Sequence, residues 1–179
     1  MKTFGGPVLF LDRSDINTDE IISSKYLGET DKKVIKPYLL EDLKINGFNP
    51  QTDVAGKCVI ITRDNFGCGA EKPQAAVALT VNSIYTVVSA GIAKNFRPAM
   101  QSNDILSIEM DRKSLADMFH TFGDKDTECK VVINDDGTAK VKLYAGSLSK
   151  SYPFQIGETD SPILEKENWG GYTTTNLKY

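Results

Sequence analysis

The segment Asp64–Pro73, with the sequence Asp-Asn-Phe-Gly-Cys-Gly-Ala-Glu-Lys-Pro, carries the residues best suited to chemistry. It follows an apolar run and precedes a helical pattern, and in an open α/β sheet ligands gather at the carboxyl ends of strands. Gly67 and Gly69 allow backbone angles and a close approach that side chains would prevent. We expect the N–H groups of Ala70 to Lys72 at a helix N-terminus, which favours an anion. The segment predicts a carboxylate or phosphate site, and the alternative is a glycine-rich turn without a ligand.

The glycine spacing of this segment excludes two common nucleotide-binding motifs. A P-loop ends in Gly-Lys-Ser or Gly-Lys-Thr, and this ending is missing. A dinucleotide-binding fingerprint has a third glycine, which is also absent. An anion site here would have to be built in another way.

A second polar segment, Asp15–Gly28, lies just beyond the first expected strand. Asp15, Asp19 and Glu20 are its acidic residues. Taken alone, such side chains are typical of solvated turns and helix caps. This segment therefore predicts a site only in combination with the first one.

The chain has one histidine, His120, and three cysteines, Cys58, Cys68 and Cys129. This inventory excludes a His-rich metal site, and the cysteines lack the spacing of a zinc site and the four thiolates of a usual iron–sulfur cluster. An odd number of scattered cysteines favours a reducing compartment. Cys68, between two glycines near a helix N-terminus, is either a thiol with a lowered pKa or a packing residue.

Length and charge narrow the possible classes of protein further. A chain of 179 residues predicts one domain, residues 1–179. The net charge is −3 and no basic stripe is present, so nucleic acid is not an expected partner. There is no run of 18 apolar residues and no signal peptide pattern, so we expect no membrane partner and a cytoplasmic location.

The elements that would position these segments alternate between strands and helices. The expected strands are Val8–Leu11, Cys58–Thr62, Ser83–Val88 and Ile105–Glu109, and the expected helices are Pro73–Val81, Gly91–Met100, Ser114–Phe119 and Ser161–Asn168. A strand, loop, helix and strand in this order indicate a parallel βαβ crossover. Ile16–Pro50 reads as a long loop with a turn of helix at Tyr38–Leu43.

The last third of the chain changes type. Cys129–Ile133 and Ala139–Tyr144 alternate around Asp136-Gly137, which is a strong hairpin signal. The sequence therefore predicts a single mixed α/β domain. Its mainly parallel sheet would be flanked by helices and carry an appended antiparallel hairpin.

Five short motifs together resemble the small subunit of 3-isopropylmalate dehydratase, the swivelling domain of the aconitase superfamily made as a separate chain. The motifs are Asn-Thr-Asp-x-Ile-Ile at 17–22, Lys-Tyr-Leu at 25–27, Asn-Phe-Gly-Cys-Gly at 65–69, Ile-Ala-Lys-Asn-Phe at 92–96 and Asn-Asp-Ile-Leu at 103–106. The most specific part is Asn-Phe-Gly-Cys-Gly combined with Thr-Asp-x-Ile. The match runs from about Phe10 to Leu106 and fades in the last third.

The resemblance implies a three-layer swivelling β/β/α domain and a large-subunit partner, in a heterodimer or heterotetramer. The partner would carry a [4Fe–4S] cluster on three cysteines of its own, so this chain would hold no cofactor and no metal. The implied reaction is that of a hydro-lyase, which removes water from a small hydroxy-dicarboxylic acid and adds it back. The implied pathway is leucine and branched-chain amino acid biosynthesis.

Residue by residue, the resemblance makes Asp19 a catalytic residue. It also assigns substrate-binding residues: Thr18, Tyr26, Leu27 and Gly28. Residues 13–50 would then contribute to substrate selection. Relatives with a longer tricarboxylic substrate have Arg where this chain has Gly28, so we expect a small or apolar distal group on the substrate. The family carries a cysteine at the position of Cys68 without using it as a nucleophile, which favours packing there.

The glycine segment departs from the family pattern after Gly69. Relatives continue with Ser-Ser-Arg-Glu-His, and the first serine, their catalytic base, is Ala70 here. The arginine that clamps a substrate carboxylate is Lys72, which keeps the charge but loses the bidentate fork. Glu71 is our candidate for the base, and its alternative role is to complement a helix dipole. Gly69, Ala70 and Lys72 are assigned to substrate binding.

Three functions remain open at this point. The first is a hydro-lyase subunit for a variant substrate, with Glu71 as the base. The second is a catalytically altered paralogue with a role in assembly or regulation. The third is a module that binds a small carboxylate without a catalytic partner.

Overall fold

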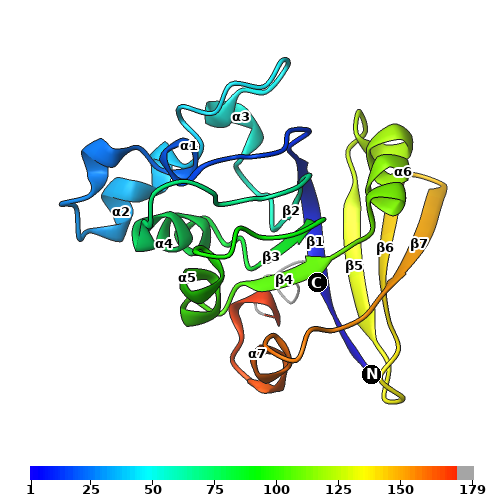
Figure 1. Ribbon diagram of the computed structural model, residues 1–179. Helices are drawn as coiled ribbons and strands as arrows, with labels where there is room; N and C mark the ends of the chain where they lie inside the picture. Colours follow the sequence, from blue (N-terminus) through cyan, green and yellow to red (C-terminus); the bar gives the residue numbers. More distant parts are fainter. Residues whose placement is uncertain (173–179) are drawn as a thin grey trace.

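A computed structural model of the chain describes residues 1–172 (Figure 1). The strands are Lys2–Phe10 (β1), Val59–Ile61 (β2), Thr86–Ser89 (β3), Leu106–Glu109 (β4), Glu128–Ile133 (β5), Ala139–Ala145 (β6) and Leu148–Phe154 (β7). The α-helices are Thr18–Ile21 (α1), Lys32–Ile35 (α2), Pro50–Asp53 (α3), Pro73–Val81 (α4), Arg97–Ser102 (α5), Arg112–Phe122 (α6) and Ser161–Glu165 (α7). Two 3₁₀ turns lie at Ser24–Tyr26 (η1) and Lys36–Tyr38 (η2). No helix within residues 1–172 has the length and apolar character needed to cross a membrane.

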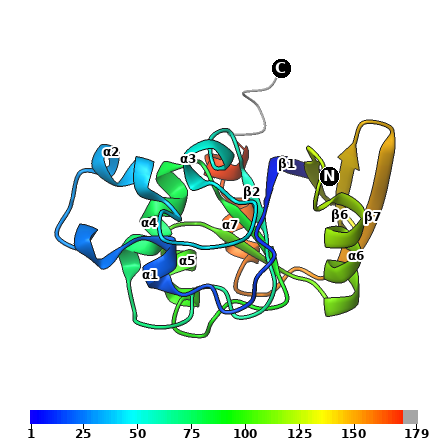
Figure 2. The ribbon, with the colours of Figure 1, turned by 90° about the horizontal axis from the view of Figure 1, so that it is seen from above.

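In the described part of the chain, the strands form one seven-stranded sheet in the order β4-β3-β2-β1-β5-β6-β7. β1 to β4 pair in parallel, and β5, β6 and β7 continue the sheet in antiparallel fashion from β1. Figures 1 and 2 show α1 to α5 gathered beside the parallel strands and α6 beside the antiparallel ones. The mixed α/β class is confirmed. The antiparallel part is larger than the expected hairpin, because β7 returns along β6.

Strands β2 and β3 are buried on both faces, as their continuous apolar runs predict. In β2, Ile60 packs in one hydrophobic core, whereas Val59 and Ile61 pack in another on the opposite face. In β3, Val87 and Val88 divide between the two cores in the same way. The first core contains side chains of α1, α4 and α5, and the second contains those of α6, α7 and the antiparallel strands.

Strand β1 belongs to both parts of the sheet. Lys2–Pro7 pairs with β5 in antiparallel register, and Val8–Phe10 pairs with β2 in parallel. Gly5 has a φ of +139°, and a Cβ added there would lie 2.1 Å from the carbonyl oxygen of Cys129 in β5. Only glycine permits both this backbone angle and this approach.

The segment Ile16–Pro50 contains more structure than the long loop we expected. The helical turn expected at Tyr38–Leu43 lies earlier, at α2 and η2, because Leu39 is extended with a ψ of 128° and Leu40 has a left-handed φ of 60°. Leu39, Leu40 and Leu43 are at most 2% exposed and pack in the core beside α4. The burial of these side chains ties the segment to the parallel strands.

Several other boundaries differ from those expected, and two of these differences have a clear local cause. The strand predicted from Ser83 begins at Thr86, because Ser83 has a left-handed φ of 62°. The helix predicted over Gly91–Met100 begins at Arg97. Pro98 lies in its first turn, where proline is favourable, so Pro98 helps to start this helix.

Candidate functional site

Three loops that follow β1, β2 and β3 lie side by side at the carboxyl end of the parallel strands. We call the second one, residues 64–72, the glycine loop. The N–H of Thr18 donates to the carbonyl of Cys68 (2.9 Å), which joins the first loop to the glycine loop. The N–H of Ala93 donates to the carbonyl of Phe66 (2.9 Å), which joins the third loop to it. The two polar segments found in the sequence are therefore neighbours.

Two glycines give the glycine loop its shape. Gly67 and Gly69 have left-handed φ angles of +84° and +89°. A Cβ added at Gly67 would lie 2.1 Å from the ring of Phe96, which is itself 1% exposed. The backbone of the loop can pass this close to a packed aromatic ring only at a glycine.

Helix α1 presents Thr18 and Asp19 to the glycine loop. Asn17 caps this helix, and its side chain accepts the N–H of Glu20 (2.9 Å). The hydroxyl of Thr18 donates to the carbonyl of Ala70 (2.6 Å). Thr18 is 1% exposed, so its hydroxyl serves the loop backbone rather than open solvent.

The ammonium group of Lys72 is buried, and its three N–H donors all have acceptors. The side chain is 3% exposed, and Nζ donates to the Asp19 carboxylate, to the carbonyl of Ile22 (2.8 Å) and to the hydroxyl of Ser24 (3.1 Å). An ammonium has three donors, so this set is complete. A substrate carboxylate would have to displace one of these acceptors. Direct substrate binding by Lys72 stays a prediction.

Asp19 is held by the same group of side chains. Its carboxylate is 59% exposed and accepts hydrogen bonds from Lys72 and from the hydroxyl of Ser24 (2.8 Å). The Lys72 hydrogen bond, followed by the Ser24 bond, lowers the pKa of Asp19. The structure therefore brings Asp19 and Lys72 together as an ion pair, with the carboxylate facing outward.

The expected helix N-terminus at Ala70 to Lys72 is wrong by a few residues. Helix α4 begins at Pro73 and Lys72 is its N-cap residue, so Ala70 and Glu71 lie before the helix. Pro73 has no N–H group to offer an anion. An anion at Ala70 or Glu71 would meet loop backbone, without the aligned N–H groups of a first helical turn.

A cavity of about 210 Å³ separates the glycine loop from α5. Glu71 lines it and is exposed. Within residues 1–172, the Glu71 carboxylate forms no hydrogen bond or ion pair. This carboxylate therefore has no partner within the described residues, whereas that of Asp19 is paired with Lys72.

The opposite wall of this cavity was missed in the sequence. It includes Asn95, Ser102 and Asn103. The side-chain amide of Asn95 donates to the carbonyl of Gly69 (3.4 Å). Two signals were available, because Asn95 lies in the motif at 92–96 and also follows the third parallel strand, so that it reaches the same end of the sheet.

The segment that we assigned to substrate selection lies against the start of α4. The carbonyl of Leu27 accepts the side-chain amide of Gln74 (3.3 Å). Leu27 is 48% exposed, and a side chain added at Gly28 would meet nothing within 4 Å. Tyr26 already has other partners, because its ring stacks on Tyr38 at 4.5 Å and its hydroxyl donates to the carboxylate of Glu41 (2.9 Å).

The thiols of Cys68 and Cys129 show no sign of activation. Burial raises the pKa of Cys68, and it raises that of Cys129 to about 12. Among residues 1–172, no group of three or more His, Cys, Asp or Glu side chains is placed to hold a metal ion. The described residues therefore offer no set of ligands for an iron–sulfur cluster.

No protein-family model matches the chain. Curated relatives include the 3-isopropylmalate dehydratase small subunit of Anaeromyxobacter dehalogenans strain 2CP-C, 31% identical over 145 residues, or 74% of this chain and 76% of the relative. The small subunit of Endomicrobium trichonymphae is 34% identical over 83 residues, and the match spans about half of each protein, 46% and 49%. The mitochondrial homoaconitase of Emericella nidulans is 28% identical over 176 residues, which are 93% of this chain but 22% of that protein.

A solved structure has a similar fold. It is the crystal structure of 3-isopropylmalate dehydratase from Methanocaldococcus jannaschii, with a TM-score of 0.65 and 19% sequence identity. The superposition covers 99% of this chain and 95% of the other. The fold likeness therefore extends through the last third, where the motifs fade.

Proposed function

The chain belongs to the family of 3-isopropylmalate dehydratase small subunits, the small subunits of an aconitase-type hydro-lyase, and on this premise we propose how it takes part in the reaction. The proposal rests on the open cavity beside the glycine loop, which Glu71 lines with an unpaired carboxylate. Residues 1–179 would act as one domain, in the cytoplasm, and cover the active site of a large subunit.

The large subunit would supply the part of the site that this chain lacks. Asp19, Gly69, Ala70 and Glu71 are exposed at the end of the parallel strands, where a partner can cover them. The [4Fe–4S] cluster that the family implies belongs on the partner, since the residues described above do not fit it. When bound there, the cluster supplies a Lewis acid for the substrate hydroxyl.

Glu71 would act as the general base of this chain. Its carboxylate accepts the carbon-bound proton of the substrate during dehydration and returns it during hydration. A carboxylate in reach of the proton can do this work, whereas the methyl group of Ala70 cannot. Asp19 and Thr18 would contact the substrate from α1, and Lys72 would keep Asp19 in place.

The substrate would be a small hydroxy-dicarboxylic acid with a small or apolar distal group. Gly28 offers no cation for a third carboxylate, and the neighbouring Leu27 is an exposed apolar side chain. Residues 13–50 would set this preference, because they carry both α1 and the 24–28 turn.

Co-expression with a large subunit from the same source tests the proposal. The complex is reconstituted with its cluster under anaerobic conditions and assayed for hydration of unsaturated diacids that differ in the distal group. We expect a stable complex and turnover, with preference for small or apolar distal groups. A complex without turnover would favour an altered paralogue, for which Ala70 is the motivating observation. Failure to form any complex, with retained binding of a small dicarboxylate, would favour the binding module.

A further inference from the structure

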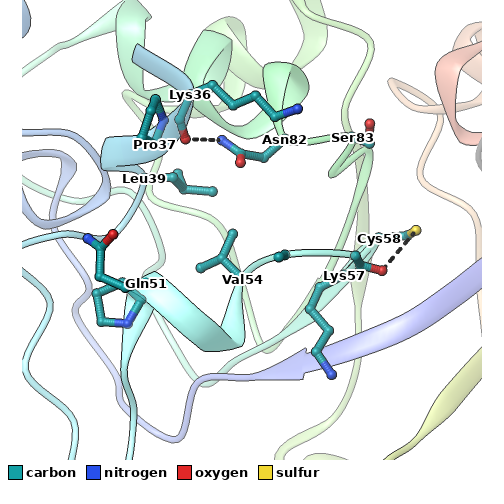
Figure 3. A pocket seen from close by; sticks show the side chains of 12 residues that line it. Lys36, Pro37, Leu39, Gln51, Val54, Lys57, Cys58, Asn82 and Ser83 are labelled. Atoms are coloured by element: carbon teal, nitrogen blue, oxygen red, sulfur yellow. Dashed lines mark hydrogen bonds between the residues drawn. The ribbon is translucent and has the colours of Figure 1, made fainter. Parts of the chain in front are cut away.

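A second cavity opens at the opposite end of the parallel strands (Figure 3). Cys58 directly precedes β2, and Asn82 and Ser83 lie between α4 and β3, so the cavity adjoins the amino ends of these strands. The glycine loop follows the carboxyl end of β2. This cavity is therefore separate from the candidate site.

The size of this second cavity suits a small organic molecule. Its volume is about 560 Å³, and pockets that bind small molecules have volumes of about 300–1,000 Å³. Leu39, Pro37 and Val54 supply apolar walls, and Figure 3 shows Leu39 and Val54 in the middle of the group. Leu39 is 2% exposed and Val54 is 6% exposed, so both are fixed parts of the core.

The charged side chains around this cavity are all cationic. Lys36 and Lys57 line it, and no acidic residue does. In the described part of the chain, neither ammonium group has a hydrogen-bond or ion-pair partner. Figure 3 shows the two side chains on opposite sides of the cavity, with Lys36 beside Asn82 and Lys57 pointing away from it, so their flexible stems would turn inward to meet a ligand.

One end of helix α4 limits how much negative charge the cavity can accept. Asn82 is the C-cap of this helix, and its side-chain amide donates to the carbonyl of Lys36 (3.1 Å). The carboxyl end of a helix carries partial negative charge. Because this charge partly offsets that of Lys36, a singly charged head group suits the rim better than a dianionic phosphate.

We propose that this cavity binds a small amphipathic carboxylate, with its apolar chain against the wall that Pro37, Leu39 and Val54 form and its carboxylate at Lys36 and Lys57. The ligand would contact a segment that is attached to the candidate active site. The N–H of Leu40 donates to the carbonyl of Ile21 in α1 (2.9 Å), directly after the wall residue Leu39.

Cys58 provides a built-in reporter for the test, because this half-buried residue lines the cavity, with its sulfur at the edge of the group in Figure 3. The full chain with Cys68→Ser is treated with iodoacetamide, and alkylation of Cys58 is followed by intact-mass spectrometry. Hexanoate should slow alkylation about tenfold at ten times its Kd. Neutral hexanamide and short acetate should have little effect. No protection by hexanoate, or equal protection by hexanoate and hexanamide, would overturn the proposal.

Variants locate the carboxylate independently of the reporter. Calorimetric titration with hexanoate should show binding to the wild type, at least tenfold weaker binding to the double variant Lys36→Gln, Lys57→Gln, and unchanged binding to Lys44→Gln. Lys44 is exposed and does not line the cavity, so it is the matched control. Unchanged affinity in the double variant, with circular dichroism confirming its fold, would contradict the proposal. This outcome would not affect the proposed hydro-lyase function.

Discussion

The two ends of the parallel strands differ in size, charge and construction. The carboxyl end has a cavity of about 210 Å³ lined by the unpaired carboxylate of Glu71, while the cation beside it, Lys72, is saturated by acceptors. The amino end has a cavity of about 560 Å³ lined by Lys36 and Lys57, with no acid.

This difference shows that one sheet can hold polar groups in fixed positions at one end and leave room for an apolar molecule at the other. At the carboxyl end, hydrogen bonds cross between three loops, and Gly67 passes against a packed ring. At the amino end, leucine, valine and proline side chains form the walls. Hydrogen bonds have strict geometry, whereas apolar burial is non-directional. The first end is therefore suited to chemistry, and the second to holding an apolar body.

Glu71→Gln should have the largest effect on the proposed enzyme. Removing a general base should lower the kcat of the reconstituted complex roughly 10²- to 10⁴-fold. The measurement is steady-state hydration of the preferred diacid. The control is Glu158→Gln, an exposed acid outside both cavities, which should keep full activity. Equal kcat values for Glu71→Gln and the wild type would show that Glu71 is not the general base.

Of two glycine-to-alanine substitutions, one at each end of the parallel strands, Gly67→Ala should be the more destabilising. The new Cβ would meet the Phe96 ring at 2.1 Å and take a left-handed φ, so we expect a loss of at least about 2 kcal/mol. Gly56→Ala at the amino end also takes a left-handed φ, +78°, but meets nothing within 4 Å. It should cost about 1 kcal/mol. The urea unfolding midpoints of the two variants are compared. An equal loss of stability in both would show that the glycine loop is not packed more tightly than the backbone at Gly56.

Lys72→Met should show how much the saturated lysine contributes. It removes three hydrogen bonds from a buried ammonium, and we expect a loss of about 1–2 kcal/mol, because the exposed Asp19 carboxylate is then solvated. Lys57→Met, which removes an unpaired cation, should change the free energy of unfolding by less than about 0.5 kcal/mol. If both variants unfold at the same urea concentration, the hydrogen bonds of Lys72 do not stabilise the fold more than the unpaired Lys57 does.

The pH dependence of stability should reveal the smallest difference. The pKa of Asp19 is lowered in the folded state, chiefly by Lys72, so its stabilising contribution is present above the unfolded pKa of about 3.9 and is lost as the pH falls through the folded value. The exposed carboxylate limits this contribution to below about 1 kcal/mol. Wild type and Asp19→Asn should therefore differ in urea midpoint at pH 7, and this difference should shrink as the pH falls below about 3.9. A difference that grows toward low pH would contradict this assignment.

Local pattern predicted the regular parts of the fold well. Continuous apolar runs located β2 and β3, and Asp136-Gly137 located the turn between β5 and β6. Strand β7 was missed because its side chains are mostly exposed and Pro153 lies within it. Proline in a run argues against a central strand, and β7 is an edge strand.

The sequence predicted which segments of the candidate site lie close together, but not which side chains contact one another. The βαβ order placed the Asp19 and Lys72 segments at one end of the sheet. It did not show that Lys72 is buried, because the acceptors that make burial possible come from Ile22 and Ser24 in a distant loop. The amino-end cavity had no motif at all, since its walls come from connections spread between Lys36 and Ser83.

The central place of β1 has a consequence for how the chain folds during synthesis. β1 is the first strand to be made, yet Lys2 pairs with Ile133, so one of its edges stays unpaired until most of the chain exists. Closing a contact this far apart along the chain is slow, and an open strand edge invites pairing with other chains. Fragments that stop before β5 should therefore self-associate, as light scattering would show, while the full chain stays monodisperse.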